Sequence, residues 1–229
     1  MKKYSAIKAP SFQAHTYWEK IPPTRILLIR HGETDWNVKR LIQGWKGTGL
    51  NSLGRRQALI LAKRIRSMDV NLDAILVSDL KRALQTALPL AARSKTPVVK
   101  MKLWRERCFG DWEGRSIEQV LEKYKLGPHT RQDPFLVFDP KGGENMIVFA
   151  ARIERALRQI ERDYRGKTVA VVTHGGPMRI AACLATGIAP KKYFLLGRPG
   201  NSSMSLIQSQ GGVRWLEFYN DTAHLEVKA

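Results

Sequence analysis

The chain has 229 residues, of which 43% are hydrophobic and 26% charged, as in an ordinary soluble globular protein and unlike a disordered one. No apolar run approaches the roughly 20 residues of a membrane-spanning helix. The formal net charge of +19 indicates an anionic partner, either a small phosphorylated ligand or a polyanion such as nucleic acid or an acidic membrane. Because the basic residues are dispersed along the chain, we do not expect nucleic-acid binding as the main function.

Residues 1–24 lack periodicity, are basic and close with Pro22-Pro23. They contain no apolar core of a secretory signal, so we expect an N-terminal basic extension packed on the surface, with an organellar transit segment as the alternative. Residues 25–229 are expected to form one domain. The two cysteines, Cys108 and Cys183, have no metal or disulfide spacing, which favours reduced thiols and a cytoplasmic location.

Three short apolar runs, at 26–29, 74–77 and 169–172, are typical of buried parallel strands. Helical patterns follow these runs, and the alternation predicts an α/β fold with a mostly parallel central sheet. In the first helix, Leu53, Ala58, Leu61, Ala62 and Ile65 share a face, with Asn51 or Ser52 as N-cap. Further helices are expected at 80–87, 115–124, 146–164 and 177–184, and a hairpin at 201–207 and 213–219.

Polar residues follow each apolar run: Arg30 and His31 after the first, Ser78 and Asp79 (capping residues) after the second, His174 and Gly175 after the third. Ligands of open α/β sheets bind outside the carboxyl ends of the strands, so these ends should converge. Arg82 lies in the first turn of the following helix, where a cation opposes the helix dipole unless an anion is bound.

Two guanidinium groups, two imidazoles and helix amides would suit a multiply charged tetrahedral anion such as phosphate. No carboxylate pair or His-x-His spacing indicates a metal.

The helix at 146–164 has an apolar stripe, and its arginines Arg152, Arg155, Arg158 and Arg162 are expected to face water. Before it, the proline-rich stretch 127–143 is irregular. We interpret the segment at about 115–143 as a lid over the site, since long irregular segments inside compact domains are usually functional or mobile.

The stretch from Leu28 to Thr34, with Asn37, resembles the L-x-R-H-G-x-T-x-x-N signature of the histidine phosphatase (phosphoglycerate mutase-like) superfamily. Further stretches match in family order over residues 25 to 225: Gln43-Gly44, Leu53-Gly54 with Gln57-Ala58, Ser78 to Ala87, Glu106 to Gly114, Gly142 to Glu144, Val172 to Gly176 and Asn220 to Leu225. The resemblance implies a three-layer α/β/α sandwich.

The resemblance also implies a mechanism that uses no metal and no cofactor. His31 would be the nucleophile and form a phosphohistidine, with its other ring nitrogen held by a backbone carbonyl. Arg30, Arg82 and His174 would surround the transferring group, and Glu106 would act as proton donor and then activate water. The substrate-binding residues would be Asn37, Gln43, Gly44 and Gly175.

The family contains both phosphatases and mutases. Trp112-Glu113-Gly114 resembles the phosphatases, whereas Arg107 after Glu106 also resembles the mutases. The segment between Gly114 and Gly142 is shorter than the mutase insertion, and a shorter lid should leave phosphohistidine open to water. We therefore expect a phosphomonoester hydrolase acting on a small phosphorylated metabolite. The alternatives are a phosphoglycerate mutase and a non-catalytic phospho-ligand or polyanion-binding protein. The sequence indicates neither the physiological substrate nor the oligomeric state.

Overall fold

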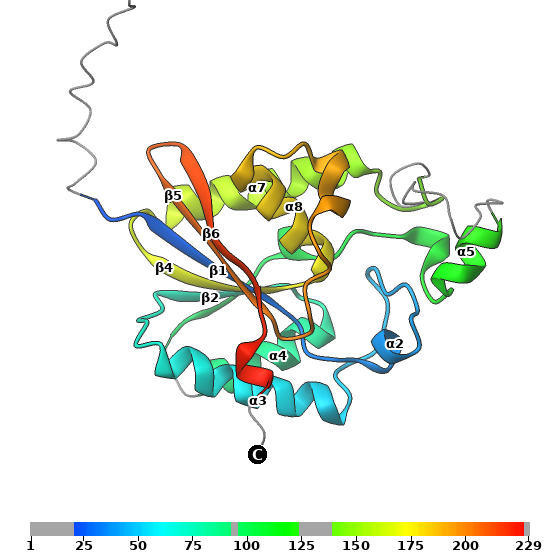
Figure 1. Cartoon of the computed structure of the whole chain (residues 1–229), viewed down its shortest axis with the longest axis horizontal. Helices are drawn as coiled ribbons and strands as arrows, with labels where there is room; N and C mark the ends of the chain where they lie inside the picture. Colours follow the sequence, from blue (N-terminus) through cyan, green and yellow to red (C-terminus); the bar gives the residue numbers. More distant parts are fainter. Residues whose placement is uncertain (1–20, 93–95, 124–138, 227–229) are drawn as a thin grey trace, which may run out of the picture.

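The computed structural model describes residues 21–92, 96–123 and 139–226. Six strands form one sheet in the order β3-β2-β4-β1-β5-β6 (Figure 1). The strands are β1 (Thr24–Arg30), β2 (Ala74–Val77), β3 (Val98–Lys100), β4 (Thr168–Thr173), β5 (Met204–Gln210) and β6 (Val213–Asp221). The first four are parallel, β5 is antiparallel to β1, and β6 is antiparallel to β5. The predicted mostly parallel sheet is confirmed.

Helices cover both faces of the sheet, which confirms the three-layer α/β/α arrangement. α3 (Ser52–Ser67) and α4 (Lys81–Ala91) lie on one face, and α7 (Met146–Asp163) and α8 (Gly175–Thr186) on the other (Figure 1). The short helices α2 (Asp35–Val38) and α5 (Ile117–Lys123) lie beyond the carboxyl ends of the parallel strands. Short 3-10 turns complete the described chain: η1 (Lys102–Trp104), η2 (Gly110–Trp112), η3 (Pro190–Leu195) and η4 (Ala223–Leu225).

The central strand β1 is buried on both faces, which explains its unbroken apolar run. Ile26 and Leu28 belong to the core beneath α7 and α8, whereas Leu27 and Ile29 belong to the core over α3 and α4. Successive side chains of a strand point to opposite faces, so a strand between two helical layers must be apolar at every position. The run ends at Arg30, where the strand reaches the edge of the sheet.

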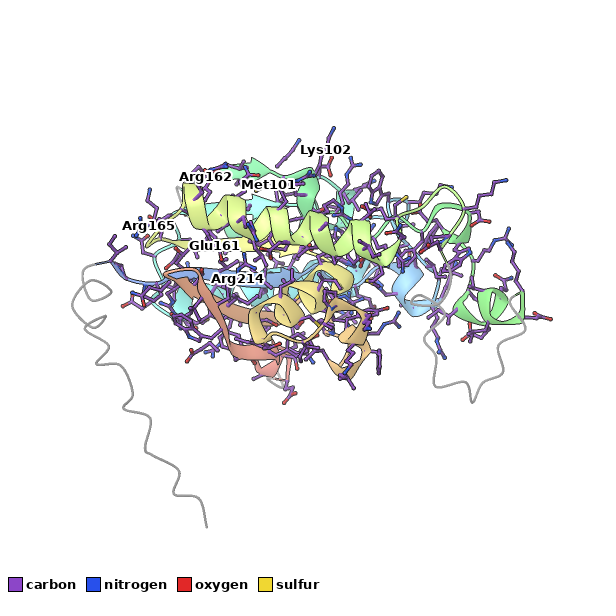
Figure 2. The ribbon with its side chains drawn as sticks, turned by 90° about the horizontal axis from the view of Figure 1, so that it is seen from above. Met101, Lys102, Glu161, Arg162, Arg165 and Arg214 are labelled. Atoms are coloured by element: carbon purple, nitrogen blue, oxygen red, sulfur yellow. The ribbon has the colours of Figure 1, made fainter. Side chains whose placement is uncertain are left out.

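The β5–β6 hairpin is attached to α7 by a network around Arg214 (Figure 2). The Arg214 guanidinium, whose side chain is only 12% exposed, donates to both Glu154 and Glu161 of α7. A guanidinium that binds two carboxylates in fork geometry fixes the relative position of the two elements more firmly than a single exposed pair would. The hairpin thereby holds a fixed place beside β1.

Several local predictions were wrong by small shifts. Asn51 is the N-cap of α3, as expected, but Leu53 is exposed, and Gly54 takes the buried position at the start of that helix. Leu80, not Ser78 or Asp79, is the N-cap of α4.

Two predicted element ranges also shifted. The first hairpin strand is Met204–Gln210 instead of 201–207, because residues 201–203 turn toward the end of β1. The helix expected at 115–124 is described as Ile117–Lys123. Most of the N-terminal extension and the lid residues 124–138 lie outside the described residues.

Within the three described ranges, no helix has both the length and the apolar character needed to cross a membrane.

The burial of α7 generates a stability prediction with an internal control. Ile153→Ala removes a fully buried side chain and should lower the free energy of unfolding by about 2–5 kcal/mol, from lost burial and the cavity that remains. Ile147→Ala changes the same residue type on the same helix where the side chain is 81% exposed, and should stay within about 0.5 kcal/mol of the parent. Urea unfolding measures both, and equal losses would contradict the described packing.

Candidate active site

The carboxyl ends of β1 and β4 bring two histidines together at one edge of the sheet. The backbone amide of His31 donates to the carbonyl of Thr173 at 2.9 Å, and the ring centroids of His31 and His174 lie 5.2 Å apart. Arg82, from the first turn of α4, reaches the same place. The convergence predicted from the three strand ends is therefore present in the structure.

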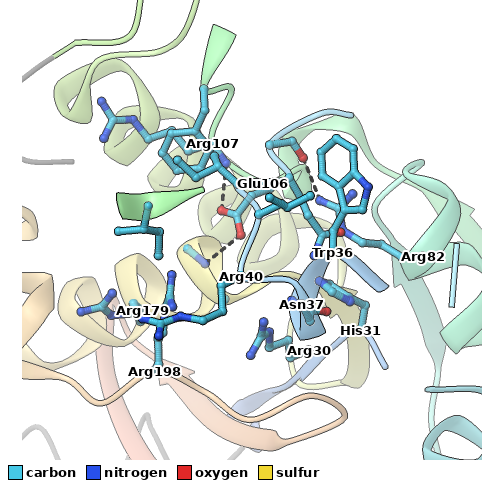
Figure 3. A pocket seen from close by; sticks show the side chains of 18 of the residues that line it. Arg30, His31, Trp36, Asn37, Arg40, Arg82, Glu106, Arg107, Arg179 and Arg198 are labelled. Atoms are coloured by element: carbon cyan, nitrogen blue, oxygen red, sulfur yellow. Dashed lines mark hydrogen bonds between the residues drawn. The ribbon is translucent and has the colours of Figure 1, made fainter. Parts of the chain in front are cut away.

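A cavity of about 350 Å³ opens at this edge (Figure 3). Among the residues that the structure describes, its wall contains six arginines and a single acid. The lining residues are Arg30, His31, Trp36, Asn37, Arg40, Leu41, Ile42, Gln43, Gly44, Arg82, Glu106, Arg107, Phe109, Ile117, Met146, Phe149, Gly175, Gly176, Arg179, Tyr193 and Arg198.

His31 is buried and held in one orientation. Its Nδ1 lies 2.7 Å from the carbonyl oxygen of Gly32, so Nδ1–H donates and Nε2 is the unprotonated nitrogen. Burial, and then the positive charges of Arg82 and Arg30, lower the pKa of His31 well below its ordinary value. The ring is therefore neutral at pH 7, and it presents a lone pair as a nucleophile must. The backbone-carbonyl partner predicted for this histidine is confirmed.

Arg82 is a buried guanidinium held by three protein acceptors. Its Nη1 and Nη2 donate to the carbonyls of Lys46 and Gly44, and its Nε donates to Nδ1 of His174 at 3.2 Å. Burial lowers its pKa to about 10, so it stays cationic at neutral pH. The carbonyls offset part of the unfavourable helix-terminus position noted in the sequence. These three hydrogen bonds leave two of its five N–H groups for a bound anion.

Arg30 occupies the end of β1 and also keeps donors available. One Nη1–H donates to the carbonyl of Pro199, while its buried Nε has no hydrogen-bond partner among the described residues. Burial lowers the pKa of Arg30 to about 10, and the nearby Glu106 carboxylate acts in the opposite direction. An unpartnered buried N–H on a cation is costly unless an anion accepts from it.

His174 lies behind the cavity wall instead of in it. Its Nδ1 accepts from Arg82, and its Nε2 lies 2.8 Å from the hydroxyl of Ser78. Burial, followed by the charge of Arg82, lowers the pKa of His174 well below its ordinary value. Both ring nitrogens are bonded within the protein, so the ring fixes the direction of the Arg82 guanidinium. Ser78, expected to cap α4, serves as the anchor of His174 instead.

Glu106 is the single acid of the cavity wall and is held at the N-terminus of α8. Its carboxylate oxygens accept from the backbone amides of Arg107 at 2.9 Å and Gly176 at 3.2 Å (Figure 3). A Cβ atom on Gly176 would lie 2.1 Å from a Glu106 oxygen, so glycine is required there for this approach. Glu106, which the family resemblance singled out, therefore has a fixed position in the cavity wall.

Arg152 places the loop that carries Glu106, contrary to the prediction that it faces water. All five N–H groups of its guanidinium are used: they donate to the carbonyls of Leu103, Arg105 and Glu106 and to the carboxylate of Glu144. Its side chain is 10% exposed. The periodicity of α7 correctly located Arg152 at the edge of the apolar stripe, but the loop that covers this edge was not foreseen.

The predicted substrate-binding residues all line the cavity. The side-chain oxygen of Asn37 accepts from the Thr34 amide and from Asn201, which leaves the amide nitrogen of Asn37 without a partner in the described chain. The Oε1 atom of Gln43 is also buried and unpartnered there. Gly175 opens α8, and a Cβ there would meet Arg30 only at ordinary contact distance.

Gly44 belongs to a loop that Glu113 fixes. The Glu113 carboxylate accepts from the backbone amides of Trp45, Lys46 and Phe109. Gly44 has a φ of +52°, and a Cβ atom there would overlap the Glu113 carboxylate at 2.0 Å. The Trp-Glu-Gly motif that indicated the phosphatases therefore has a structural role: it holds the loop whose carbonyls orient Arg82.

Three further cavity arginines were missed by the sequence reasoning. Arg40, Arg179 and Arg198 come from three separate segments, and nothing in their local sequence distinguishes them from the other arginines of a chain with 39 basic residues. Within the described ranges, no group of three or more histidine, cysteine, aspartate or glutamate side chains could hold a metal ion.

The fold and this cavity define a phosphate-handling α/β enzyme of a recognisable class. The family model of the histidine phosphatase superfamily (branch 1) matches residues 26–222, and the chain belongs to this family. The resemblance predicted from the motifs is confirmed.

The chain is 35% identical to "Phosphoglycerate mutase-like protein 4" of Arabidopsis thaliana, over 91% of this chain and 90% of that protein. It is 31% identical to "Phosphoserine phosphatase 1" of Hydrogenobacter thermophilus, over 88% of this chain and 94% of that protein. Among solved structures, "Bacillus stearothermophilus YhfR" superposes with a TM-score of 0.81 at 31% identity, covering 89% of this chain and all of that one. These similarities agree with the predicted fold and with a phosphatase.

The depressed histidine pKa values generate a prediction for the effect of pH on stability. Because the unfolded His31 ring titrates near its ordinary pKa and the folded ring well below it, the unfolded state binds more protons in the window between the two values. The free energy of unfolding should therefore fall as pH is lowered from 7.5 to 5.5. Urea unfolding of the parent and of His31→Asn at both pH values measures the effect. The variant should lose part of the pH dependence, about 1 kcal/mol, and an unchanged dependence would contradict the assignment.

Proposed function

We propose that the chain is a phosphomonoester hydrolase that acts through a phosphohistidine on His31. The single observation that carries the proposal is the orientation of the His31 ring, whose Nδ1 is held by the Gly32 carbonyl beside the buried Arg82 and the partly buried Arg30. In the first step Nε2 attacks phosphorus, the ester oxygen leaves, and the phosphoryl group is bonded to the ring. In the second step water attacks the same phosphorus, and inorganic phosphate and the free ring are released.

Arg30 and Arg82 stabilise the charge on the transferring group. Their remaining N–H groups lie in the cavity wall beside His31, where preorganised cations favour the transition state of phosphoryl transfer. Asn37 adds a neutral donor through its free amide nitrogen. His174 acts by orienting Arg82, since both of its own nitrogens are bonded to protein.

Glu106 is proposed as the acid and base. In the first step it donates a proton to the leaving oxygen, and in the second it accepts a proton from the attacking water. Its support is its place in the same cavity wall as His31 and the two backbone amides that hold it there. No metal or cofactor takes part in the proposed mechanism.

The proposed setting is a small phosphorylated substrate in a reducing, cytoplasmic compartment. Support for the compartment comes from Cys108 and Cys183, both free thiols. The domain is proposed to span residues 25–229. Several described residues of the proposed lid at about 115–143 contact the cavity wall. Ile117 of α5 lines the wall, Ser116 pairs with Leu41 as an isolated bridge, and Glu118 and Asp139 pair with Arg40 and Arg107.

Replacement of the nucleophile tests the mechanism. His31→Ala should lower the hydrolysis of an aryl phosphate by at least about a thousandfold. The parent, quenched during turnover with labelled substrate, should carry an acid-labile, base-stable phosphoryl group that His31→Ala lacks. The control is Arg155→Gln, an exposed change on α7 outside the cavity, which should retain parent activity. Phosphate recovered on serine or cysteine would refute the scheme.

A second assay separates the hydrolase from the alternative, a phosphoglycerate mutase. One similar protein carries the name phosphoglycerate mutase-like. The enzyme is supplied with 3-phosphoglycerate and a trace of 2,3-bisphosphoglycerate, and free phosphate is measured against 2-phosphoglycerate. A hydrolase releases phosphate and forms no isomer. Accumulation of 2-phosphoglycerate without release of phosphate would establish the mutase instead.

A further inference from the structure

The positive charge of the cavity exceeds what one phosphoryl group requires. Arg30 and Arg82, beside His31, already provide the guanidinium groups for the transferring phosphate. The buried Arg107 donates to the carbonyl of Glu144 and lies 3.6 Å from Asp139. The three other arginines of the wall, Arg40, Arg179 and Arg198, are not explained by the phosphoryl site.

Arg198 is exposed at the cavity and lies next to Arg30. It directly precedes Pro199, whose carbonyl accepts from Arg30, and the charge of Arg198 contributes after burial to the lowered pKa of Arg30. Within the described part of the chain, Arg198 makes no hydrogen bond or ion pair. Arg30 and Arg198 repel each other, and an anion bound at Arg198 would reduce that repulsion.

Arg179 is oriented by Tyr193. Its Nε donates to the Tyr193 carbonyl at 3.1 Å, and its guanidinium stacks 3.9 Å from the centre of the tyrosine ring. Stacking and one hydrogen bond hold the planar group in place, while neither Nη1 nor Nη2 has a partner in the described ranges. Figure 3 shows Arg179 and Arg198 together on the side of the cavity next to Arg30, away from Trp36 and Arg82.

Arg40 contributes less to this group. It is paired with Glu118 at 3.3 Å, and both side chains are well exposed. The pairs Arg40–Glu118 and Arg107–Asp139 leave Arg179 and Arg198 as the two cations of the cavity wall that have neither an acidic partner in the described chain nor a place at the phosphoryl site.

We propose that the substrate carries a second anionic group, a phosphate or a carboxylate, which Arg179 and Arg198 bind while its phosphoryl ester lies against His31. This inference rests on the hydrolase proposed above and narrows its substrate class. The volume of about 350 Å³ suits a small molecule with both groups inside one cavity. Phe109, Met146 and Phe149 form an apolar part of the wall. This surface suits the carbon chain that connects the two anionic groups of the substrate.

The test compares phosphate esters that differ only in the far end. The probes are 3-hydroxypropyl phosphate, 3-carboxypropyl phosphate and the bisphosphate of 1,3-propanediol. For each enzyme the measured quantity is the ratio of kcat/KM for a charged probe to kcat/KM for the hydroxyl probe. The parent ratio should be about ten or more, and it should fall about tenfold in Arg198→Gln and in Arg179→Gln, mainly through KM. Arg155→Gln removes an equal charge away from the cavity and should keep the parent ratio.

The outcomes separate this inference from the hydrolase itself. A parent ratio near one for both charged probes, or a ratio that Arg198→Gln leaves unchanged, overturns the second anion site while the phosphatase stands. Preference for the carboxylate or for the bisphosphate identifies the second group. If none of the three probes is hydrolysed while the aryl phosphate is, this inference alone is overturned; if the aryl phosphate is not hydrolysed either, the hydrolase is overturned, and this inference with it. Arg198 is exposed, so Arg198→Gln should fold. If Arg179→Gln does not fold, Arg179→Lys replaces it in the comparison.

Discussion

The structure depends on keeping two guanidinium groups, those of the buried Arg82 and the partly buried Arg30, beside an uncharged histidine. Arg30 and Arg82 repel each other and disfavour protonation of His31, so the arrangement survives only because fixed acceptors surround it. Those acceptors are the carbonyls of Gly44, Lys46 and Pro199, and the nearby Glu106 carboxylate adds a favourable charge without a hydrogen bond to either arginine. The same charges that keep the ring neutral also prepare the cavity for a phosphate. Electrostatic repulsion thus favours both the neutral form of the His31 ring and an anionic ligand beside it.

Two carboxylates that do not line the cavity hold the loops that form its wall. Glu113 gathers three backbone amides and shapes the loop that carries Gly44 and Lys46. Glu144 binds Arg152 and the amide of Cys108, and so fixes both sides of the loop that carries Glu106. Each loop is irregular and could adopt many conformations alone. A partly buried carboxylate that accepts from two or more donors restricts the loop to one conformation and so fixes the position of the cavity wall.

The layered fold and the location of the cavity could be predicted because they follow from local patterns. Apolar runs give strands buried on both faces, and parallel connections bring their polar ends to one edge, so Arg30, His31 and Arg82 could be placed together. The orientation of His174 could not, because its partners Arg82 and Ser78 lie 92 and 96 residues away in the chain. Arg152 and Arg198 show the same limit. Helix periodicity gives the face on which Arg152 lies, and the sequence gives a loop for Arg198, but only the packed structure shows which residues surround each side chain.

The central position of β1 has a consequence for how the enzyme is made. β1 lies between β4, about 140 residues further along the chain, and β5, about 180 residues further along. The carbonyl of His31 accepts hydrogen bonds from Asn201 and Ser202, and its amide donates to Thr173, so His31 is bound by residues that the ribosome adds late. A nascent chain that has made only its first half therefore holds the signature motif but no assembled cavity. The cavity is complete only when β4 and the C-terminal hairpin lie in place beside the first strand.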